Sequence, residues 1–362
     1  MPLQQWPIWH STGKDECKLN KPAIGFGIVG CGMIARWHAA ALAAIAQAGG
    51  AAHLTGVADQ DCARATAFAA ERNVRAYSSV ADLVADAQIQ AVCICTPNGT
   101  HAEMALTALR AGKHVLIEKP LALCVEDCDK LIEEARRQNV CAGVVSQLRF
   151  GEAIQAVRAL LQSEGLGRMI CAELSMRYHR ESAYYQNSTW HGTREMDGGG
   201  ALMNQGIHGI DLLLHLMGPA QQVWGLAATR VHSIPVEDTA VAALRFASGA
   251  LGTVVATTAS APGYPRRMTL TGERGSITLT EDGLSEWQVP GIAMPNCARM
   301  EAHGAASPDG IPLRGHIAQL ADFAQAIRHA RPCAVTLEDG RRAVDLITSI
   351  YAAAHTGKMV HL

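Results

Sequence analysis

The sequence predicts two domains: an α/β domain of the doubly wound type, followed by an α+β domain with a large, mostly antiparallel open sheet. Short apolar runs alternate with helical stretches from residue 23 to residue 146, which is typical of a parallel sheet covered on both faces. Five β-rich runs separated by turn residues then follow one another between residues 223 and 280, which indicates antiparallel strands. A chain of 362 residues also exceeds the usual size of one domain. We therefore expect an N-terminal extension at 1–22, a cofactor domain at 23–146 and a substrate-binding and oligomerisation domain at 147–362.

The first domain is predicted from apolar strands, each followed by a helix with apolar periodicity. The predicted strands are Ala23–Val29, His53–Ala58, Arg75–Tyr77, Ala91–Thr96, His114–Ile117 and Cys141–Ser146. The predicted helices between them are Arg36–Ala48, Asp61–Glu71, Val80–Ala85, His101–Ala111 and Val125–Gln138.

The second domain is predicted to begin with a helix, an alternating strand and a polar, aromatic loop. These are Ala153–Gln162, Arg168–Tyr178 and His179–Asp197, and a helix over Ala201–Met217 follows three glycines. The run of strands comes next, and Pro290–Pro312 is expected to be a loop. Two helices, Ile317–Arg328 and Asp339–His355, are expected to close the chain.

The composition excludes several classes of protein. With 49% apolar and 18% charged residues, the chain is not intrinsically disordered, and it has no apolar run long enough for a membrane helix. A net charge of -2 gives no basic face for nucleic acid. The 11 cysteines are an odd number, which indicates free thiols in a reducing compartment, and residues 1–22 lack the features of a signal peptide. We therefore expect a cytoplasmic protein that binds neither nucleic acid nor membranes.

The stretch Gly30-Cys31-Gly32-Met33-Ile34-Ala35 has the pattern G-x-G-x-x-A between a predicted strand and a predicted helix. Gly30 allows a tight turn, Gly32 lets a pyrophosphate approach the backbone, and Ala35 lets the helix pack closely on the strand. The phosphates would then lie at the start of a helix, where free N–H groups favour anions. An ordinary glycine turn is the alternative, but the strand, the helix and the following βα units together predict a dinucleotide site of the Rossmann type.

Asp59 follows the second predicted strand, where an acid can accept hydrogen bonds from the adenosine ribose and repel a 2′-phosphate. The next arginine is Arg64, so the sequence favours NAD over NADP. The alternative is that Asp59 is the N-cap of the next helix.

Two further segments end strands at the edge where doubly wound sheets bind ligands. Thr96, Pro97 and Asn98 follow the fourth strand, with His101 close behind, and are expected to reach the ribose or the nicotinamide; a turn and helix cap is the alternative. Glu118 and Lys119 follow the fifth strand. A lysine beside a cationic nicotinamide should have a lowered pKa and could exchange a proton with a substrate, although such a pair is often only a solvated one.

The predicted helix over Ala201–Met217 carries a polar stripe at helical spacing. Asn204, His208, Asp211 and His215 are expected to share one face, which favours an active-site wall over isolated core histidines. A metal is not expected here, because asparagine is a poor ligand. No metal is expected at the cysteines either: we expect Cys93 and Cys95 to point to opposite faces of their strand, and the pair Cys124 and Cys128 has no second ligand pair nearby.

Taken together, these motifs resemble the Gfo/Idh/MocA oxidoreductases, named for glucose-fructose oxidoreductase and inositol dehydrogenase. The resemblance extends from Ala23 to Leu362 and is carried by GCGMIA, TPNGTHAEMAL, AGKHVLIEKP, DGGGALMNQGIHGIDLL and TGERGSITL. It implies a second domain whose exposed sheet face makes dimer or tetramer contacts, and a catalytic pair formed by Lys119 and His208. It also implies that the Lys119–Pro120 bond can be cis.

One position departs from the family pattern, because many members have Asp where this chain has Asn204. An asparagine cannot relay a proton, so acid–base chemistry would fall to His208 and Lys119, with Asn204 as the third catalytic residue. The segment YYQNSTWHGTREMDGGGALMNQGIH is most similar to members that oxidise C3 of nucleotide-linked sugar acids.

The sequence thus predicts an NAD-dependent dehydrogenase of sugars, cyclitols or nucleotide sugars, working as a homodimer or homotetramer. The residues expected in the substrate wall are Arg149, Tyr178, Arg180, Tyr185 and Trp190, besides Asn204 and His208. A redox-assisted glycosidase or lyase with retained NAD would need the same residues and is an alternative. A non-catalytic regulator that senses the cofactor is disfavoured, because Lys119 and His208 are both present.

Overall fold

The structure is a computed structural model that describes residues 22–297 and 313–362. The predicted extension, except for Pro22, and the last part of the predicted loop at Pro290–Pro312 lie outside these residues. Among the described helices, none combines the length and the apolar character needed to cross a membrane.

The first sheet has six parallel strands in the order β3-β2-β1-β4-β5-β6. The strands are β1 (Ile24–Val29), β2 (Ala52–Ala58), β3 (Arg75–Tyr77), β4 (Ala91–Ile94), β5 (His114–Ile117) and β6 (Ala142–Val144). The strand order reverses between β1 and β4, which is the switch point where doubly wound sheets bind ligands at the carboxyl ends of their strands. The predicted α/β domain is confirmed.

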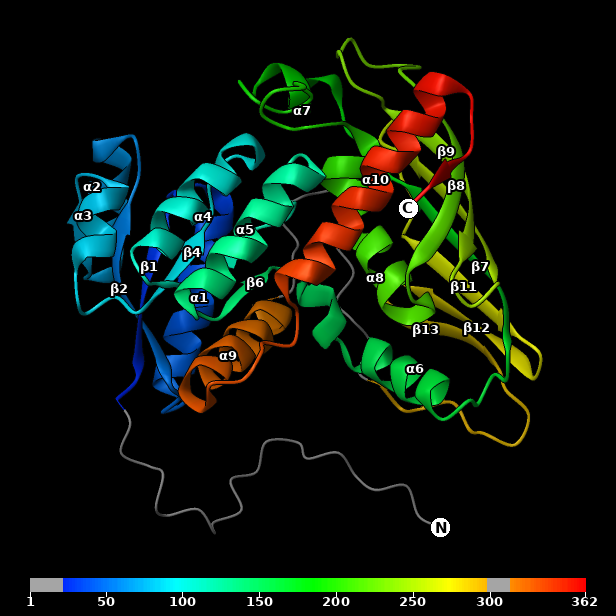
Figure 1. The fold of residues 1–362 in the computed structure, drawn as a ribbon, viewed down its shortest axis with the longest axis horizontal. Coiled ribbons are helices and arrows are strands. Elements are labelled where there is room, and N and C mark those ends of the chain that lie inside the picture. The colour runs from blue at the N-terminus through cyan, green and yellow to red at the C-terminus, as the bar shows by residue number, and fades with distance from the viewer. Residues whose placement is uncertain (1–21, 298–312) are drawn as a thin grey trace.

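Helices cover both faces of this sheet (Figure 1). One face carries α1 (Met33–Gln47) and α2 (Cys62–Arg72), and the other carries α3 (Val80–Ala85), α4 (His101–Arg110) and α5 (Val125–Gln138). Two helices from the end of the chain complete the cover: α9 (Leu313–His329) packs beside α1, and α10 (Leu337–Thr356) packs beside α5. The C-terminal helices therefore contribute to the core of the first domain.

The second sheet has eight strands in the order β13-β12-β11-β7-β10-β9-β8-β14, and all neighbours are antiparallel except β7 and β10. The strands are β7 (Met169–Arg177), β8 (Ala220–Ala228), β9 (Thr239–Phe246), β10 (Leu251–Thr257), β11 (Arg267–Gly272), β12 (Gly275–Thr280), β13 (Gly283–Gln288) and β14 (Val360–His361). The predicted large, mostly antiparallel sheet is confirmed.

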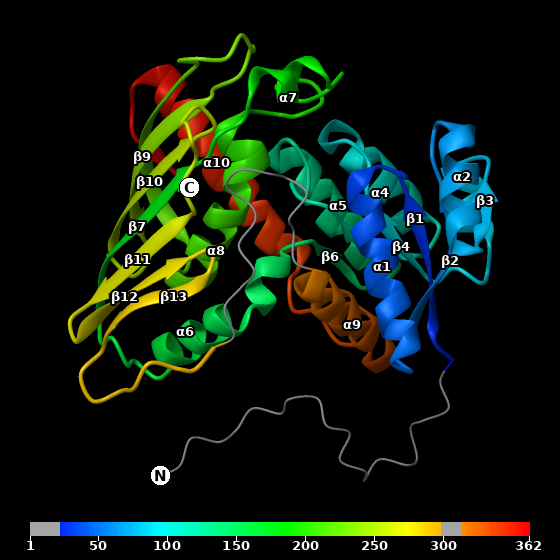
Figure 2. The ribbon, with the colours of Figure 1, turned by 180° about the vertical axis from the view of Figure 1, so that it is seen from behind.

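Only one face of the second sheet is covered by described helices. It packs against α6 (Glu152–Gln162), α8 (Ile207–Met217) and α10, which lie between the two sheets (Figure 2). The opposite face exposes large apolar side chains from neighbouring strands, among them Trp224, Leu226 and Val241. We call these three side chains the outer patch.

The segment predicted as one helix over Ala201–Met217 begins differently. Ala201–Gly206 is π-helical, and α8 starts at Ile207. At the start of the π-helical turn, a Cβ at Gly200 would lie 1.7 Å from the Glu237 carbonyl oxygen, so only glycine fits there. The Glu237 carboxylate accepts the N–H groups of Gly200 and Leu202 at 3.0 and 2.9 Å. The wider turn changes the spacing between Asn204 and His208 from that of a regular α-helix.

Candidate functional site

The turn between β1 and α1 has the geometry of an anion site. Gly30 has φ +91°, and a Cβ there would lie 2.6 Å from the Cys95 carbonyl oxygen, so this position requires glycine. Gly32 immediately precedes α1, and a Cβ there would meet no atom within 4 Å. Met33 begins the helix with an exposed side chain, and Ile34 is partly buried. The start of α1 at Gly32 therefore borders open space that a pyrophosphate could occupy.

Asp59 lies at the end of β2, beside this turn. Its carboxylate accepts the backbone N–H groups of Cys31 at 2.7 Å and Asp61 at 2.9 Å, and Arg64 donates to both of its oxygens at 3.0 and 2.7 Å. Burial raises the pKa of Asp59, but the Arg64 guanidinium and the two N–H groups outweigh it and hold the pKa below its usual value. The N-cap of α2 is Asp61 and not Asp59, so that alternative is wrong.

His101 joins the two loops that end β4 and β5. Its Nδ1 lies 2.7 Å from the Pro120 carbonyl oxygen, and its Nε2 lies 2.8 Å from the Thr96 carbonyl oxygen. Because the ring is buried between them, it fixes the loop that begins with Thr96 and Pro97 relative to the loop that contains Lys119. Asn98 is buried in the first of these loops and begins a short 3-10 turn.

Lys119 connects the two domains. It follows β5, the Lys119–Pro120 peptide bond is cis, and its Nζ donates to the carbonyl oxygen of Asn204 at 3.0 Å and to the Asn204 side-chain oxygen at 3.2 Å. Burial lowers the pKa of Lys119, and the charge of Arg180 lowers it further, whereas Glu118 and Asp197 oppose the shift. A lysine with a lowered pKa can exchange a proton near neutral pH more easily than a solvated one.

His208 lines a small cavity together with Lys119, Ser146 and Asp211. Burial lowers the pKa of His208 to about 3, and the positive charge of Lys119 adds to this effect. The imidazole is therefore neutral at neutral pH, and one ring nitrogen is available to accept a proton or a hydrogen bond.

Asp197 is a buried residue of this site that the sequence reasoning missed. Its Oδ1 accepts the side-chain amides of Asn98 at 3.0 Å and Asn204 at 2.8 Å. Its Oδ2 accepts the Gly192 N–H at 2.7 Å, and burial raises its pKa to about 6. A continuous path of hydrogen bonds therefore runs from Asn98 through Asp197 and Asn204 to Lys119. The position of Asp197 directly before three glycines was the available sequence signal.

The polar stripe on α8 divides between two environments. Asp211 accepts two hydrogen bonds from Arg149 and one from Ser146, and Arg149 also pairs with Asp339 at 3.3 Å. His215 contacts Arg158. The structure therefore brings Asn204 and His208 to Lys119, but it commits Arg149 to a buried ion-pair network instead of the proposed substrate wall.

The other predicted wall residues lie around the loop that follows β7. Tyr178 is buried in the core of the second domain, and the Tyr185 hydroxyl lies 2.9 Å from that of Thr258. The Arg180 guanidinium lies 5.7 Å from the centre of the Tyr184 ring, and its charge acts on Lys119.

Three stacked rings complete this region, of which the sequence reasoning named Trp190 but not Tyr184 or His191. Trp190 packs on His191 with 3.8 Å between ring centres, and His191 stacks on Tyr184 at 4.3 Å. Burial lowers the pKa of His191 to about 4, and the charge of Lys119 contributes. His191 therefore lies within electrostatic reach of Lys119.

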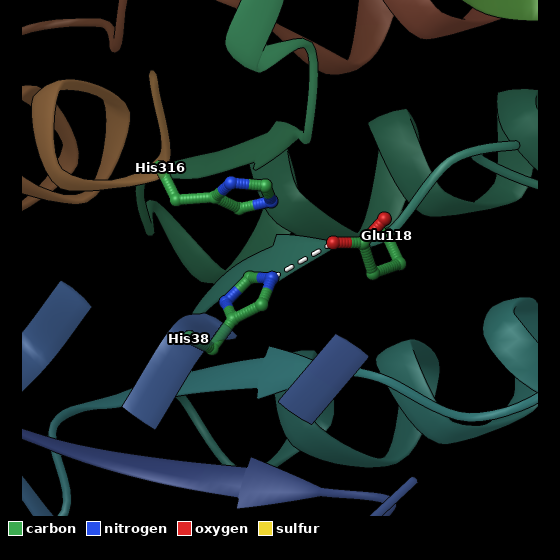
Figure 3. Close-up of side chains that lie close together, drawn as sticks. All are labelled: His38, Glu118 and His316. Carbon is green, nitrogen blue, oxygen red and sulfur yellow. Dashed lines mark hydrogen bonds and ion pairs between the residues drawn. The ribbon is translucent and has the colours of Figure 1, made fainter. Parts of the chain in front are cut away.

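Among the described residues, one group has the residue types and the proximity to hold a metal ion: His38, Glu118 and His316, whose ligand atoms lie within 4.8 Å of one another (Figure 3). Cys93 and Cys95 contact the same His38 ring. The expectation that these two cysteines point to opposite faces was wrong, because residues two apart on a strand share a face. The absence of a metal cofactor remains a prediction.

Comparison with known proteins agrees with this geometry. Residues 24–146 match a family model described as the GFO_IDH_MocA oxidoreductase family with an NAD-binding Rossmann fold. Residues 154–278 match the GFO/IDH/MocA C-terminal domain.

Individual relatives extend the match over most of the chain. The chain is 29% identical over 345 residues to 1,5-anhydro-D-fructose reductase of Ensifer adhaerens, covering 93% of this chain and 98% of that protein. It is 30% identical over 262 residues to inositol 2-dehydrogenase 2 of Saccharopolyspora erythraea, covering 71% and 73%. The crystal structure of the WlbA dehydrogenase from Bordetella pertussis, in complex with NADH and UDP-GlcNAcA, matches with a TM-score of 0.84 at 29% identity over 94% of this chain and 98% of that one.

Proposed function

Because the chain belongs to the Gfo/Idh/MocA family of NAD-binding oxidoreductases, we propose that it oxidises a secondary hydroxyl of a sugar, cyclitol or nucleotide sugar. The observation that carries the proposal is the contact of Lys119 with Asn204 beside His208. In this contact, Lys119 from the cofactor domain meets the π-helical turn that leads into α8 of the second domain. That is the point where a bound cofactor and a bound substrate would meet.

The residues present fit NAD as the cofactor. The open start of α1 at Gly32 suits a pyrophosphate, and Asp59 beside it suits the adenosine ribose. When bound, NAD supplies the acceptor for a hydride. We propose that Thr96, Pro97, Asn98, His101, Glu118 and Lys119 form the remaining wall of this site.

The acid–base chemistry belongs to the residues of this chain. The neutral imidazole of His208 accepts the proton of the substrate hydroxyl, and Lys119 donates a hydrogen bond to the alkoxide that develops. The C–H bond of the carbinol carbon breaks as a hydride leaves, so a ketone forms. Asn204 orients Lys119, because its carbonyl and side-chain oxygens both accept hydrogen bonds from the Lys119 amine. Asp197 in turn orients Asn204 by accepting a hydrogen bond from its side-chain amide.

The loop after β7 supports a sugar substrate, and more particularly an anionic one. Trp190, Tyr184 and His191 supply aromatic rings, and the nearby Arg180 guanidinium supplies a positive charge that would attract a carboxylate or phosphate. Among the relatives, the WlbA dehydrogenase was crystallised with UDP-GlcNAcA, whose name denotes a nucleotide-linked sugar acid. We propose that this chain prefers such an acid to a neutral sugar.

The outer patch supports a homodimer or homotetramer. Leu226 and Val241 are paired across β8 and β9, and both are about half exposed. Trp224 lies two residues before Leu226 on the same face. A contiguous apolar surface on a sheet is typical of a contact between copies.

Incubation of the protein with NAD and a panel of neutral sugars, cyclitols, nucleotide sugars and nucleotide sugar acids tests the proposal. The absorbance of NADH should rise with one class, and most strongly with the acids. Formation of a cleaved product without net NADH would instead identify a redox-assisted glycosidase or lyase. No product with any class, despite tight binding of NAD, would contradict the proposed activity and favour a cofactor sensor.

A further inference from the structure

We infer that His38 is a positioning residue for Lys119 and acts through the carboxylate of Glu118. The inference rests on the proposed function, because it assumes that Lys119 works at the substrate. It concerns a cluster next to Lys119 in the sequence, where three buried side chains from three separate elements meet (Figure 3). His38 comes from α1, Glu118 from the end of β5, and His316 from the start of α9.

The first link is the contact between His38 and Glu118. Nε2 of His38 lies 2.8 Å from Oε1 of Glu118, and both side chains are almost completely buried. Burial alone would raise the pKa of Glu118, but the hydrogen bond and charge of His38 together with the charges of His316 and Lys119 outweigh it and lower the pKa to about 2. The carboxylate is therefore ionised at neutral pH and depends on its partner for compensation.

The second link is the contact between Glu118 and the lysine backbone. The other carboxylate oxygen, Oε2, accepts the N–H of Lys119 at 3.2 Å. The Glu118 carboxylate therefore bridges the His38 ring on α1 and the backbone N–H of Lys119. The Lys119 side chain continues from this point to Asn204 in the second domain.

The arrangement gives α1 two tasks. Its first turn, at Gly32 and Met33, lies where the pyrophosphate is proposed to bind, and His38 lies on the buried side further along the same helix. The ring of His316 contacts that of His38 edge to face, with 5.6 Å between ring centres, and so backs it from α9. A displacement of the His38 ring would let the Lys119 backbone shift, and small misplacements of a catalytic group reduce turnover strongly.

The same residue types could also hold a divalent metal ion, since two imidazoles and a carboxylate form a common ligand set. The geometry favours a hydrogen-bond relay, because Nε2 of His38 is already directed at the carboxylate that a metal would share. The test therefore includes a measurement of the metal content of the purified protein.

The experiment compares His38→Leu and His38→Gln with Leu42→Ala in the full chain. Leu42 is fully buried one turn further along α1, so its truncation perturbs the same helix but removes no hydrogen bond to Glu118. His38→Leu should lower kcat on the order of 10- to 100-fold, with NAD affinity nearly unchanged. His38→Gln should recover most of the loss, because its amide can donate to Oε1. Leu42→Ala should lower the melting temperature and leave kcat of the folded enzyme unchanged.

A second variant keeps the inference testable if His38→Leu does not fold. Glu118→Gln removes the negative charge and one of the two acceptor oxygens, so it should lower kcat as His38→Leu does. Equal kcat losses in His38→Leu and Leu42→Ala would overturn the inference, as would a His38→Gln variant no more active than His38→Leu. Stoichiometric metal in the purified protein, with activity lost on chelation, would also overturn it.

The variant Lys119→Met separates failure of this inference from failure of the proposed function. If Lys119→Met leaves turnover intact, the proposed function fails. If Lys119→Met is inactive but His38→Leu keeps full turnover, only this inference fails.

Discussion

The two sheets of this molecule differ in how many of their faces are covered by helices. In the first sheet, every residue of β4 and all but one of β1 are buried, because helices pack on both faces. In the second sheet, β9 alternates strictly between buried and exposed residues, because helices cover only one face. The exposed positions nevertheless include the apolar outer patch. The first sheet is thus covered on both faces within one chain, whereas the second leaves an apolar face uncovered by the described residues.

The proposed chemistry is distributed in the same unequal way. The first sheet supplies it from short motifs at the ends of its strands, as in Lys119 after β5 and Asp59 after β2. The second domain supplies it from a helix and a long loop, whose side chains are brought together only by the tertiary fold. Changes at strand ends of the first sheet should therefore affect catalysis or cofactor choice, whereas changes at the buried ion pairs and the outer patch of the second domain should affect stability and assembly.

The largest effect is expected at the end of β5. Lys119→Met should reduce turnover about 10²- to 10⁴-fold, the usual loss for one positioned proton-transfer group, and should leave NAD binding nearly intact. Lys113→Met is the matched control, because Lys113 precedes the same strand at its opposite edge and donates only to the backbone carbonyls of Asp86 and Ile89. Steady-state kinetics and NAD titration measure both variants. Equal losses would show that the carboxyl edge of the sheet has no special role.

In the second domain, a stability effect is expected where the sequence reasoning proposed a substrate contact. Arg149→Leu leaves Asp211 without its guanidinium partner in a buried setting. Breaking a buried ion pair on one side typically costs about 3–5 kcal/mol of the free energy of unfolding. Chemical denaturation of Arg149→Leu and of Arg158→Leu, whose partner is the uncharged ring of His215, measures the difference. A stable Arg149→Leu enzyme with a raised KM would restore Arg149 to the substrate wall.

This contrast shows what the sequence can predict in physical terms. The positions of the glycine turn, Asp59 and Lys119 at one edge of the sheet were predictable, because each lies within a few residues of a strand end and the strand order of a parallel sheet places those ends together. The contacts of Arg149 and Tyr178 were not predictable. In a sequence, an arginine or tyrosine after a strand looks the same whether its partner is a ligand or a buried part of the protein. Asp197 was missed for a related reason: its partners Asn98 and Asn204 come from both domains, and only the fold brings them within hydrogen-bond distance.

The outer patch offers the next test of the comparison. Replacing Trp224 and Leu226 by Glu in one variant should convert an oligomer into a particle of 38.4 kDa, because two charges would be buried without partners in the contact. Light scattering at micromolar concentration reports the mass. Val231→Glu is the control, since Val231 is 69% exposed in the turn after β8 and lies outside the patch. A wild-type particle of 38.4 kDa would contradict the assembly that the bare sheet face predicts.

The smallest effect is expected at Asp59, where the first sheet selects its cofactor. Arg64 pairs with both oxygens of Asp59, so the adenosine ribose must compete with that guanidinium for the carboxylate. A 2′-phosphate in the same place would be repelled by the negative charge of Asp59. Asp59→Ala removes the acceptor for the ribose and frees Arg64, which is a suitable partner for phosphate. We expect NAD to bind about tenfold more weakly, in line with the loss of one hydrogen bond to a charged group. NADP should bind more tightly, so that the preference for NAD over NADP becomes smaller.

Asp61→Ala is the matched control for Asp59→Ala. It removes the cap of the adjoining helix, at a cost of about 1 kcal/mol of stability, but leaves Asp59 and its charge in place. Titration of both cofactors into the three proteins separates the outcomes: equal affinities for NAD and NADP in the unmutated protein would mean that Arg64 already cancels the charge of Asp59, and that the strand end alone does not determine the choice.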